Sequence, residues 1–175
     1  KAYSLISASK VRNEMIVNDV IACIEMKQTP VILTRFKEHA KLLYDTLKEE
    51  ADHVFLLYGD NTDKENADIR VRLKQVPKNE SLILVATGQK IGEGFDFPRL
   101  DVLMLAAPVS FEGRLEQYVG RLNRDYEGKE AVYVYDYIDA HMRFFNKMYG
   151  KRLKTYKKTG FSIWTGDEQT KQIIN

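Results

Sequence analysis

The sequence contains very little cysteine, no long apolar run and no large excess of charge of one sign. Cys23 is its one cysteine in 175 residues, so no disulfide can form within the chain, as is usual in a reducing compartment. Every apolar run is far shorter than the ~18–20 residues that a membrane-spanning helix needs, and no signal peptide is visible. The net charge of +2 identifies no partner by itself. We therefore expect a cytoplasmic protein with no membrane partner.

The composition is typical of a folded domain. Hydrophobic residues make up 44% of the chain and charged residues 30%, which argues against disorder. The histidines at 39, 53 and 141 lack the spacing of metal ligands, so we predict no metal site. The chain begins at Lys1 and not at Met, and we expect it to be a piece of a longer protein.

Short apolar segments alternate with segments of helical periodicity. The predicted strands cover residues 30–34, 53–59, 81–87, 101–107 and 131–138. They are apolar throughout, which is typical of strands that are buried on both faces. The predicted helices cover residues 11–26, 36–50, 62–75, 111–124 and 139–158, and Thr62 with Glu65 forms a capping box for the third. This order predicts an α/β fold, with helices on both faces of a parallel sheet and ligands at the carboxyl ends of its strands.

A glycine-rich segment, "ATGQKIGEGFDFPRLD" (86–101), follows the third predicted strand. Glycine permits a positive φ and the close approach of another backbone. Thr87 and Gly88 end the strand, where hydroxyl and N–H groups could meet a phosphate, and Asp96 follows. A tight structural loop with a capping aspartate is the other interpretation of a single glycine-rich segment, because short glycine matches are common by chance.

The segment "EQYVGRLNR" (116–124) places Gln117, Arg121 and Arg124 on one helix face, beside Gly120. Two guanidinium groups on one face repel each other unless an anion lies between them. The planar guanidinium matches a phosphate with paired hydrogen bonds. The alternative is a solvated face on which Arg124 interacts favourably with the negative end of the helix dipole.

Taken together, these segments resemble the second, carboxyl-terminal RecA-like lobe of superfamily-two helicases and translocases. "ILTRFKEHAKLL" (32–43) resembles motif IV, "VATGQKIGEGFDFP" (85–98) motif V and "QYVGRLNR" (117–124) motif VI. Their order and spacing agree with the family over residues 28 to 138. "LAAPVSFEGRLEQYVGRLNR" and "VYDYID" are most similar to the DEAD/DEAH-related branch of DNA repair translocases and restriction-type helicases. Tyr118 and Asn123 depart from motif VI, which often has a basic residue and a glycine there.

The resemblance implies a role for each matching residue. Arg124 matches the arginine finger, Arg121 matches a second arginine that reaches the γ-phosphate, and Gln117 opens motif VI. Gly94 and Asp96 match a pair near the nucleotide ribose and the cleft between lobes. The positions that correspond to contacts with nucleic acid are Thr87, Gly88, Arg35 and Lys90. The branch favours DNA over RNA.

The same resemblance implies ATP and Mg²⁺, held mainly by an amino-terminal lobe of the same polypeptide. The 175 residues contain neither a Walker A loop nor a D-E-x-x box, so we expect this portion to be inactive alone. The alternative function is a non-catalytic domain that binds nucleic acid or serves as a scaffold and keeps the helicase-like fold.

We divide the chain into a lobe at residues 1–138 and a basic helical extension at 139–175. A stripe of basic residues in the extension is either a solvated helix face or a contact with a phosphate backbone. Tyr156, Phe161 and Trp164 either stack on bases or anchor the tail, and Asp139 is predicted to cap the helix. The stripe consists of Arg143, Lys147, Lys151, Lys154 and Lys158.

Overall fold

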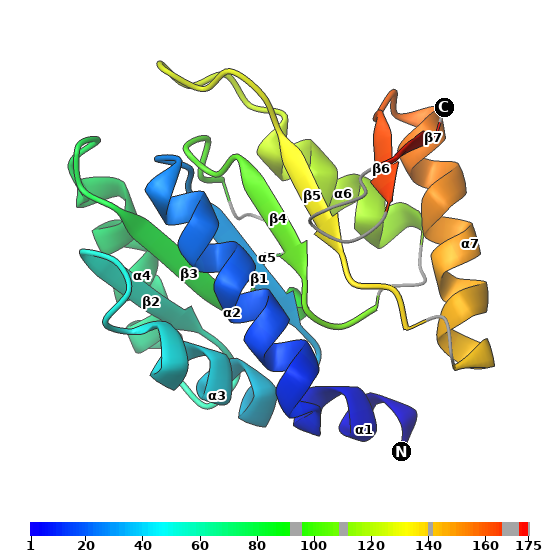
Figure 1. Cartoon of the computed structure of the whole chain (residues 1–175). Helices are drawn as coiled ribbons and strands as arrows, with labels where there is room; N and C mark the ends of the chain where they lie inside the picture. Colours follow the sequence, from blue (N-terminus) through cyan, green and yellow to red (C-terminus); the bar gives the residue numbers. More distant parts are fainter. Residues whose placement is uncertain (92–95, 109–111, 140–141, 166–171, 175) are drawn as a thin grey trace.

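The structure is a computed structural model of residues 1–175, and it describes residues 1–91, 96–108, 112–139, 142–165 and 172–174. Its centre is a five-stranded sheet with the strand order β2-β3-β1-β4-β5 (Figure 1). All four strand pairs are parallel, so the predicted RecA-like α/β fold is confirmed. The strands are β1 (Pro30–Thr34), β2 (His53–Leu57), β3 (Leu82–Thr87), β4 (Val102–Leu105) and β5 (Tyr133–Asp136).

Helices cover both faces of the sheet (Figure 1). On one face, side chains of α2 (Lys10–Glu25) and α3 (Lys37–Leu47) share a buried cluster with strand residues such as Ile32 and Met104. On the other face, α4 (Asp63–Gln75) and α6 (Glu112–Leu122) share a second cluster with Leu33 and Leu105. Neighbouring strand residues thus point to opposite cores, and continuous apolar strands are the result. β5 is only partly buried because it is the edge strand.

The structure adds elements that periodicity did not predict. The helix α1 (Ala2–Ala8) places Ile6 against Phe145 and Met148 of α7 (Arg143–Lys158). The short helix α5 (Gly88–Ile91) follows β3 directly, and β6 (Ile163–Thr165) pairs antiparallel with β7 (Gln172–Ile174). No helix in the described part of the chain combines the length and apolar character that a membrane span requires.

A buried ion pair fixes α7 to the end of β5. The Arg152 guanidinium donates two hydrogen bonds to the Asp136 carboxylate, with N···O distances of 2.6 and 2.8 Å, and Arg152 is only 2% exposed. Tyr156 donates its hydroxyl to the same carboxylate at 2.7 Å and lies in the main core, where Phe161 packs against it. Tyr156 and Phe161 therefore anchor the tail. The Trp164 side chain lies outside the described part of the structure.

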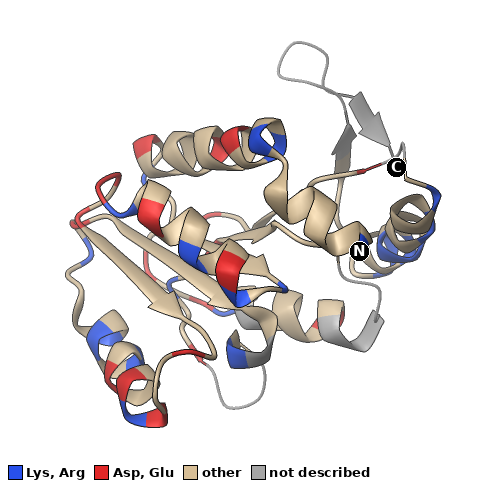
Figure 2. Cartoon of the chain, turned by 90° about the horizontal axis from the view of Figure 1, so that it is seen from below, with Lys and Arg blue, Asp and Glu red and all other residues tan. Residues whose placement is uncertain are grey.

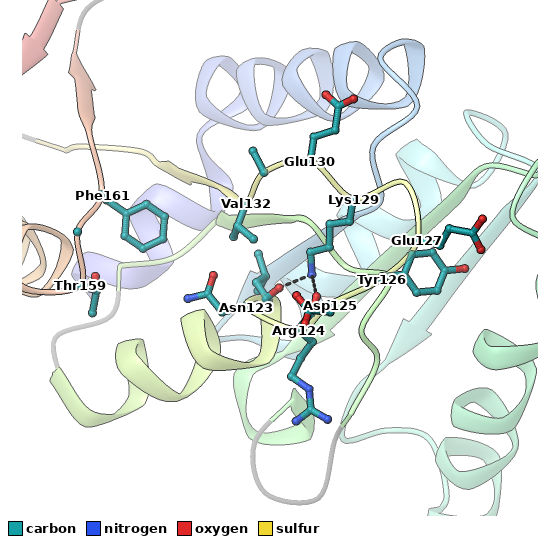
Figure 3. Close-up of a pocket in the computed structure, with 13 residues that line it drawn as sticks. Asn123, Arg124, Asp125, Tyr126, Glu127, Lys129, Glu130, Val132, Thr159 and Phe161 are labelled. Atoms are coloured by element: carbon teal, nitrogen blue, oxygen red, sulfur yellow. Dashed lines mark hydrogen bonds between the residues drawn. The ribbon is translucent and has the colours of Figure 1, made fainter.

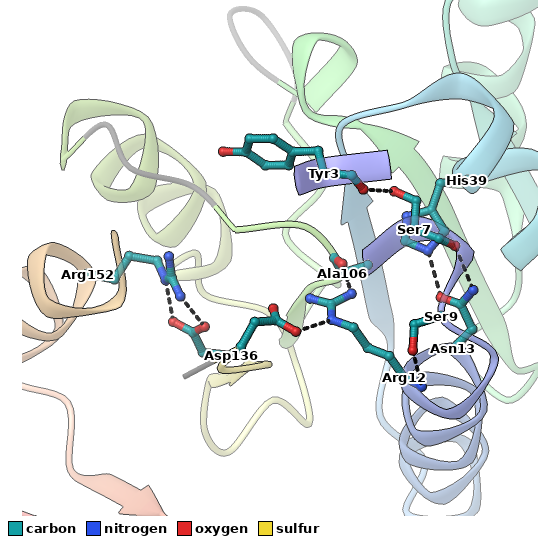
Figure 4. A network of polar contacts seen from close by, with 10 residues as sticks. Tyr3, Ser7, Ser9, Arg12, Asn13, His39, Ala106, Asp136 and Arg152 are labelled. Carbon is teal, nitrogen blue, oxygen red and sulfur yellow. Dashed lines mark hydrogen bonds and ion pairs between the residues drawn. The ribbon is translucent and has the colours of Figure 1, made fainter. Parts of the chain in front are cut away.

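Asp139 does not cap α7, and this prediction is wrong. The residue that caps α7 is Met142, which contributes no side-chain hydrogen bond. The Asp139 carboxylate instead accepts from Arg12 Nε at 3.1 Å, and both side chains are buried (Figure 4). A buried guanidinium needs an anionic partner, and this requirement outweighs a cap that water could replace. The predicted capping by Thr62 is confirmed, since its hydroxyl accepts from Glu65 N at 3.1 Å.

A partly buried chain of hydrogen bonds runs through His39 and joins α1, α2, β1 and α3. Figure 4 shows its members Ser7, Asn13 and His39. Asn13 donates through Nδ2 to the Ser7 carbonyl at 2.9 Å, which turns its Oδ1 toward His39 Nε2 at 2.8 Å. Nε2 must then carry the proton, and Nδ1 accepts from the Thr34 hydroxyl at 2.6 Å. Burial, assisted by the nearby Arg12 charge, lowers the pKa of His39 from 6.5 to about 4.

This pKa makes stability depend on pH. Below pH 6.5 the unfolded chain binds a proton at His39 that the folded chain does not bind until about pH 4. The free energy of unfolding should therefore fall by up to ~1.4 kcal/mol per pH unit as acid is added across that window. Urea unfolding of the wild type and of His39→Gln at a series of pH values measures the effect. The difference between the two proteins should change with pH, and a constant difference would contradict the assignment.

Candidate nucleotide-binding face

The helix α6 has one buried and one exposed face. Its buried side chains are Leu115, Tyr118, Val119 and Leu122, which pack into the core beneath the sheet. Gln117 and Gly120 lie on the exposed face, as predicted. Arg124 is exposed too, but α6 ends at Leu122 and not at residue 124 as predicted, so Arg124 follows the helix and does not belong to its face. The Arg121 side chain and Gly94 lie outside the described part of the structure.

Arg124 lies beside Asp96, at the end of the glycine-rich segment. Its Nη2 is 3.4 Å from Asp96 Oδ2, and the side chains are 50% and 46% exposed. An exposed ion pair of this length contributes only ~0–1 kcal/mol, because water screens both charges. The pair brings the two predicted nucleotide-binding positions together without locking either. An incoming anion could therefore exchange with Asp96 at little cost.

Lys129 ties the two segments together from behind. Its ammonium group donates to the carbonyl oxygens of Arg124 and Pro98, each at 2.9 Å, and to that of Leu122. Leu122 ends α6 and Arg124 lies in the turn that follows it, whereas Pro98 follows Asp96. The carbonyls at a helix end lack partners within the helix, and Lys129 supplies them. Burial lowers the pKa of Lys129, while Asp101 and Asp125 act in the opposite direction.

Figure 3 shows the Lys129 side chain within the turn after α6, with the Arg124 guanidinium extending away from it. An open pocket of about 690 Å³ lies along this turn. Residues 122–127 and 129–132 line the pocket together with Thr159, Gly160 and Phe161 of the tail. Arg124 is therefore at the junction between this pocket and the Asp96 loop. Sequence reasoning missed Lys129, because nothing in the segment "YEGKEA" marks its side chain as turned inward.

Thr87 and Gly88 end β3 at the carboxyl edge of the sheet, as predicted. Thr87 is buried and lies opposite Thr34 in the register of β1 and β3. Tyr118 donates its hydroxyl to the Gly88 carbonyl at 3.2 Å, so the motif VI helix is bonded directly to motif V. A Cβ atom on Gly88 would lie 2.5 Å from that hydroxyl oxygen. Tyr118, one of the departures from the family pattern, therefore gives this glycine a packing role.

The two other residues predicted to contact nucleic acid, Lys90 and Arg35, both make contacts within the lobe. Lys90 lies within α5, and its carbonyl accepts from Arg70 of α4 at 3.4 Å. Arg35 directly follows β1 and is exposed, with its guanidinium 4.2 Å from the centre of the Tyr3 ring. Because β1 and β3 are parallel neighbours in register, Arg35 and Gly88 follow the ends of adjacent strands. The structure thus places Arg35 and Thr87–Gly88 at the same sheet edge.

The contact between Gly88 and Tyr118 predicts a matched pair of glycine substitutions with opposite effects. Gly88→Ala should cost ~1–3 kcal/mol, because the buried tyrosine ring cannot move aside freely. Gly120→Ala should raise the free energy of unfolding by ~0.5–1 kcal/mol, because Gly120 lies on the exposed face of α6 and its Cβ would meet nothing within 4 Å. Urea unfolding of the 175-residue chain measures both.

Removing the Tyr118 hydroxyl tests the cause. In Tyr118→Phe the nearest remaining atom, Cζ, is 3.4 Å from the added methyl, so Gly88→Ala should cost much less in that background. An equal cost in both backgrounds would show that the hydroxyl is not what requires glycine.

Comparison with known proteins finds viral relatives in sequence and helicase lobes in structure. No protein-family profile matches the chain. Protein 161L of invertebrate iridescent virus 6, named as a candidate helicase, is 35% identical over 119 residues, covering 68% of this chain and 23% of that protein. Transcript termination protein A18 of fowlpox virus is 28% identical over 142 residues, covering 79% of this chain and 30% of that protein. The chain therefore spans less than a third of the length of either relative.

Solved structures share the fold. T4 UvsW superposes with a TM-score of 0.71 at 22% identity, covering 91% of this chain and 35% of that one. A DEAD-box helicase domain 2 bound to an RNA duplex has a TM-score of 0.59 at 23% identity, covering 86% and 56%. An ATP-dependent restriction-modification enzyme bound to DNA has a TM-score of 0.55 at 18% identity, covering 74% and 10%. The chain has the fold of the carboxyl-terminal RecA-like lobe of superfamily-two helicases.

Proposed function

We propose that the chain is the second motor lobe of an ATP-dependent helicase or translocase and that it supplies Arg124 as the arginine finger. The observation that carries the proposal is the position of Arg124, which is exposed after the end of α6 and whose guanidinium forms a weak, exposed ion pair with Asp96. A guanidinium in this state can exchange its carboxylate partner for a phosphate, with which it forms stronger paired hydrogen bonds.

The residues present suit one half of a nucleotide site. Arg124, together with Arg121 three residues before it, would face the γ-phosphate. Gln117 would lie one helical turn before Arg121 on α6. Asp96, once released by Arg124, would be available to a ribose hydroxyl, near Gly94. Among the described residues there is no group of three or more potential metal ligands, and we assign Mg²⁺ to the other lobe together with most of the ATP contacts.

Phosphoryl transfer depends mainly on positioning and on charge around the γ-phosphate. An arginine that reaches the transferred group typically raises turnover by ~10³–10⁵. In this chain Lys129 fixes the backbone from which Arg124 projects, whereas the side chain itself is held loosely. The lobe can therefore deliver the guanidinium when the cleft closes and withdraw it when the cleft opens. ATP bound at the cleft would supply the energy for that cycle.

The proposal requires a second lobe. The sequence has no Walker A loop and no acidic box, and the chain spans 23% of 161L and 30% of A18. We infer that both lobes belong to one polypeptide and that this portion alone does not hydrolyse ATP. The nucleic acid would cross the carboxyl edge of the sheet, where Thr87, Gly88, Arg35 and Lys90 lie, and we favour DNA as the substrate.

The test is substitution of Arg124 in the protein that contains both lobes. Arg124→Ala should reduce kcat for nucleic-acid-stimulated ATP hydrolysis by ~10³ or more, with little change in ATP affinity, because the other lobe supplies most of the binding. Arg124→Lys should recover only a small part, since an ammonium cannot form the paired contact. ATPase kinetics and nucleotide binding are the measurements.

Arg72→Ala is the matched control. Arg72 is an exposed arginine on α4 with an acidic partner, Asp68, at 3.9 Å. Its replacement should leave kcat unchanged. If Arg124→Ala retained turnover within a few-fold of the wild type, the finger assignment would be lost, and a non-catalytic lobe that binds nucleic acid would become the better interpretation.

A further inference from the structure

Tyr3 is the centre of an aromatic and cationic cluster at the carboxyl edge of the sheet. The Arg35 guanidinium lies over its ring at 4.2 Å. Three phenylalanine rings meet Tyr3 edge-to-face, with centroid distances of 6.3 Å for Phe36, 6.2 Å for Phe144 and 5.1 Å for Phe145. The cluster joins the start of α1, the residues that directly follow β1 and the start of α7. Arg35 and Phe144 are therefore both ordered by one ring.

Two planar groups of this cluster face solvent. The side chain of Phe144 is 55% exposed although Phe145, next to it, is 1% exposed and lies in the core. Arg35 is exposed as well. Phe145 and Met148 make the contact of α7 with Ile6, whereas Phe144 touches Tyr3 and Phe145 only at the rim and leaves most of its ring in solvent. Bases stack on aromatic rings and on arginine planes of this kind.

Phe144 lies on the same face of α7 as the four lysines of the basic stripe and precedes them in sequence. Residues 144, 147, 151, 154 and 158 follow steps of three and four, so they lie on one helix face. All four lysines of this face are exposed, and in the described part of the chain only Lys158 has an acidic partner, Glu116 at 3.2 Å. α7 contains no Asp or Glu, and Figure 2 shows it carrying only positive charge. The stripe is about 20 Å long at ~1.5 Å per residue.

The location suits a strand of nucleic acid. Arg35 directly follows the end of β1, and Thr34 lies opposite Thr87 in the sheet register. The surface formed by Arg35 and Phe144 is therefore at the same edge as the Thr87–Gly88 turn. The ion pair between Arg152 and Asp136 holds α7 against β5, so the stripe extends from that edge along a fixed helix.

We propose that Phe144 and Arg35 form a base-stacking platform for single-stranded nucleic acid and that the lysines of α7 bind the phosphates that follow. This site lies outside motifs IV to VI except for Arg35, and it gives the nucleic-acid role of the proposed function a specific surface. Stacking on an aromatic side chain contributes ~1–3 kcal/mol per base and tolerates any sequence. Each lysine adds an affinity that falls as salt rises. A pre-ordered platform also loses little side-chain entropy on binding.

The experiment is fluorescence anisotropy of the 175-residue chain with labelled oligo(dT), oligo(U) and an abasic oligonucleotide of equal length. Phe144→Ala should weaken oligo(dT) and oligo(U) binding by ~5-fold or more and leave abasic binding unchanged, because only bases stack. Lys147→Glu with Lys151→Glu should weaken all three and reduce the salt dependence. Arg35→Gln should resemble Phe144→Ala on the base-containing strands.

Matched controls separate the platform from general effects. Tyr133→Ala removes another exposed ring, at the start of β5, and Lys64→Glu reverses an exposed charge on α4. Neither should change binding. Thermal unfolding should show that Phe144→Ala stays folded, since the ring is mostly outside the core. A preference for anionic vesicles over oligonucleotides, or equal losses on abasic and base-containing strands, would overturn the proposal.

This test is independent of the arginine finger. Arg124→Ala should leave oligonucleotide binding by the isolated chain unchanged, because the proposal assigns Arg124 to the nucleotide phosphate and not to the stacking platform. If Phe144→Ala bound the oligonucleotides with wild-type affinity while Arg124→Ala lost ATP turnover, the motor assignment would stand and only the platform would be lost.

Discussion

Peptide carbonyls left over at the ends of helices and strands must find donors, and in this lobe three cationic side chains supply many of them. Lys129 serves the end of α6 and the segment before β4. Arg99 gathers carbonyls after α4, including those of Pro77 at 3.2 Å and Glu80 at 2.5 Å. Arg12 donates to the Ala106 carbonyl at the end of β4. A charged donor makes several strong hydrogen bonds at once, so each of these cations fixes the backbone of a whole turn. The loops at the ends of the strands are held in place in this way.

The candidate site uses this rigidity unevenly. The backbone around Arg124 is fixed by Lys129, and the motif VI helix is bonded to motif V through Tyr118 and Gly88. The guanidinium itself forms a screened contact with Asp96. A group that must alternate between two partners needs a fixed attachment and a weakly bound tip, because a strong resting interaction would have to be broken in every cycle. The contrast between the backbone held by Lys129 and the exposed ion pair of Arg124 is therefore what the proposed arginine finger requires.

Periodicity predicted the five strands of the sheet and the helices between them, because burial on two faces leaves a local pattern that spans five to fifteen residues. It could not predict contacts between distant positions. Asp139 resembles a helix cap locally, but its partner Arg12 is 127 residues away. Phe145 of α7 shares a buried cluster with Ile6 of α1, although the two helices lie at opposite ends of the chain. Lys129 was not predicted, since nothing local marks three carbonyls around it.

The position of the tail follows from one buried carboxylate. Asp136 ends β5 and accepts bonds from both Arg152 and Tyr156, so α7 cannot rotate about its own axis without breaking a largely buried ion pair. Removing only one partner of such a pair leaves a desolvated charge, which is strongly unfavourable. Fixing the rotation of α7 directs Phe145 and Met148 inward and leaves Phe144 and the lysines outward. A basic helix with free rotation would present a diffuse positive charge. This helix presents the Phe144 ring and then a row of lysines in a fixed order along its axis.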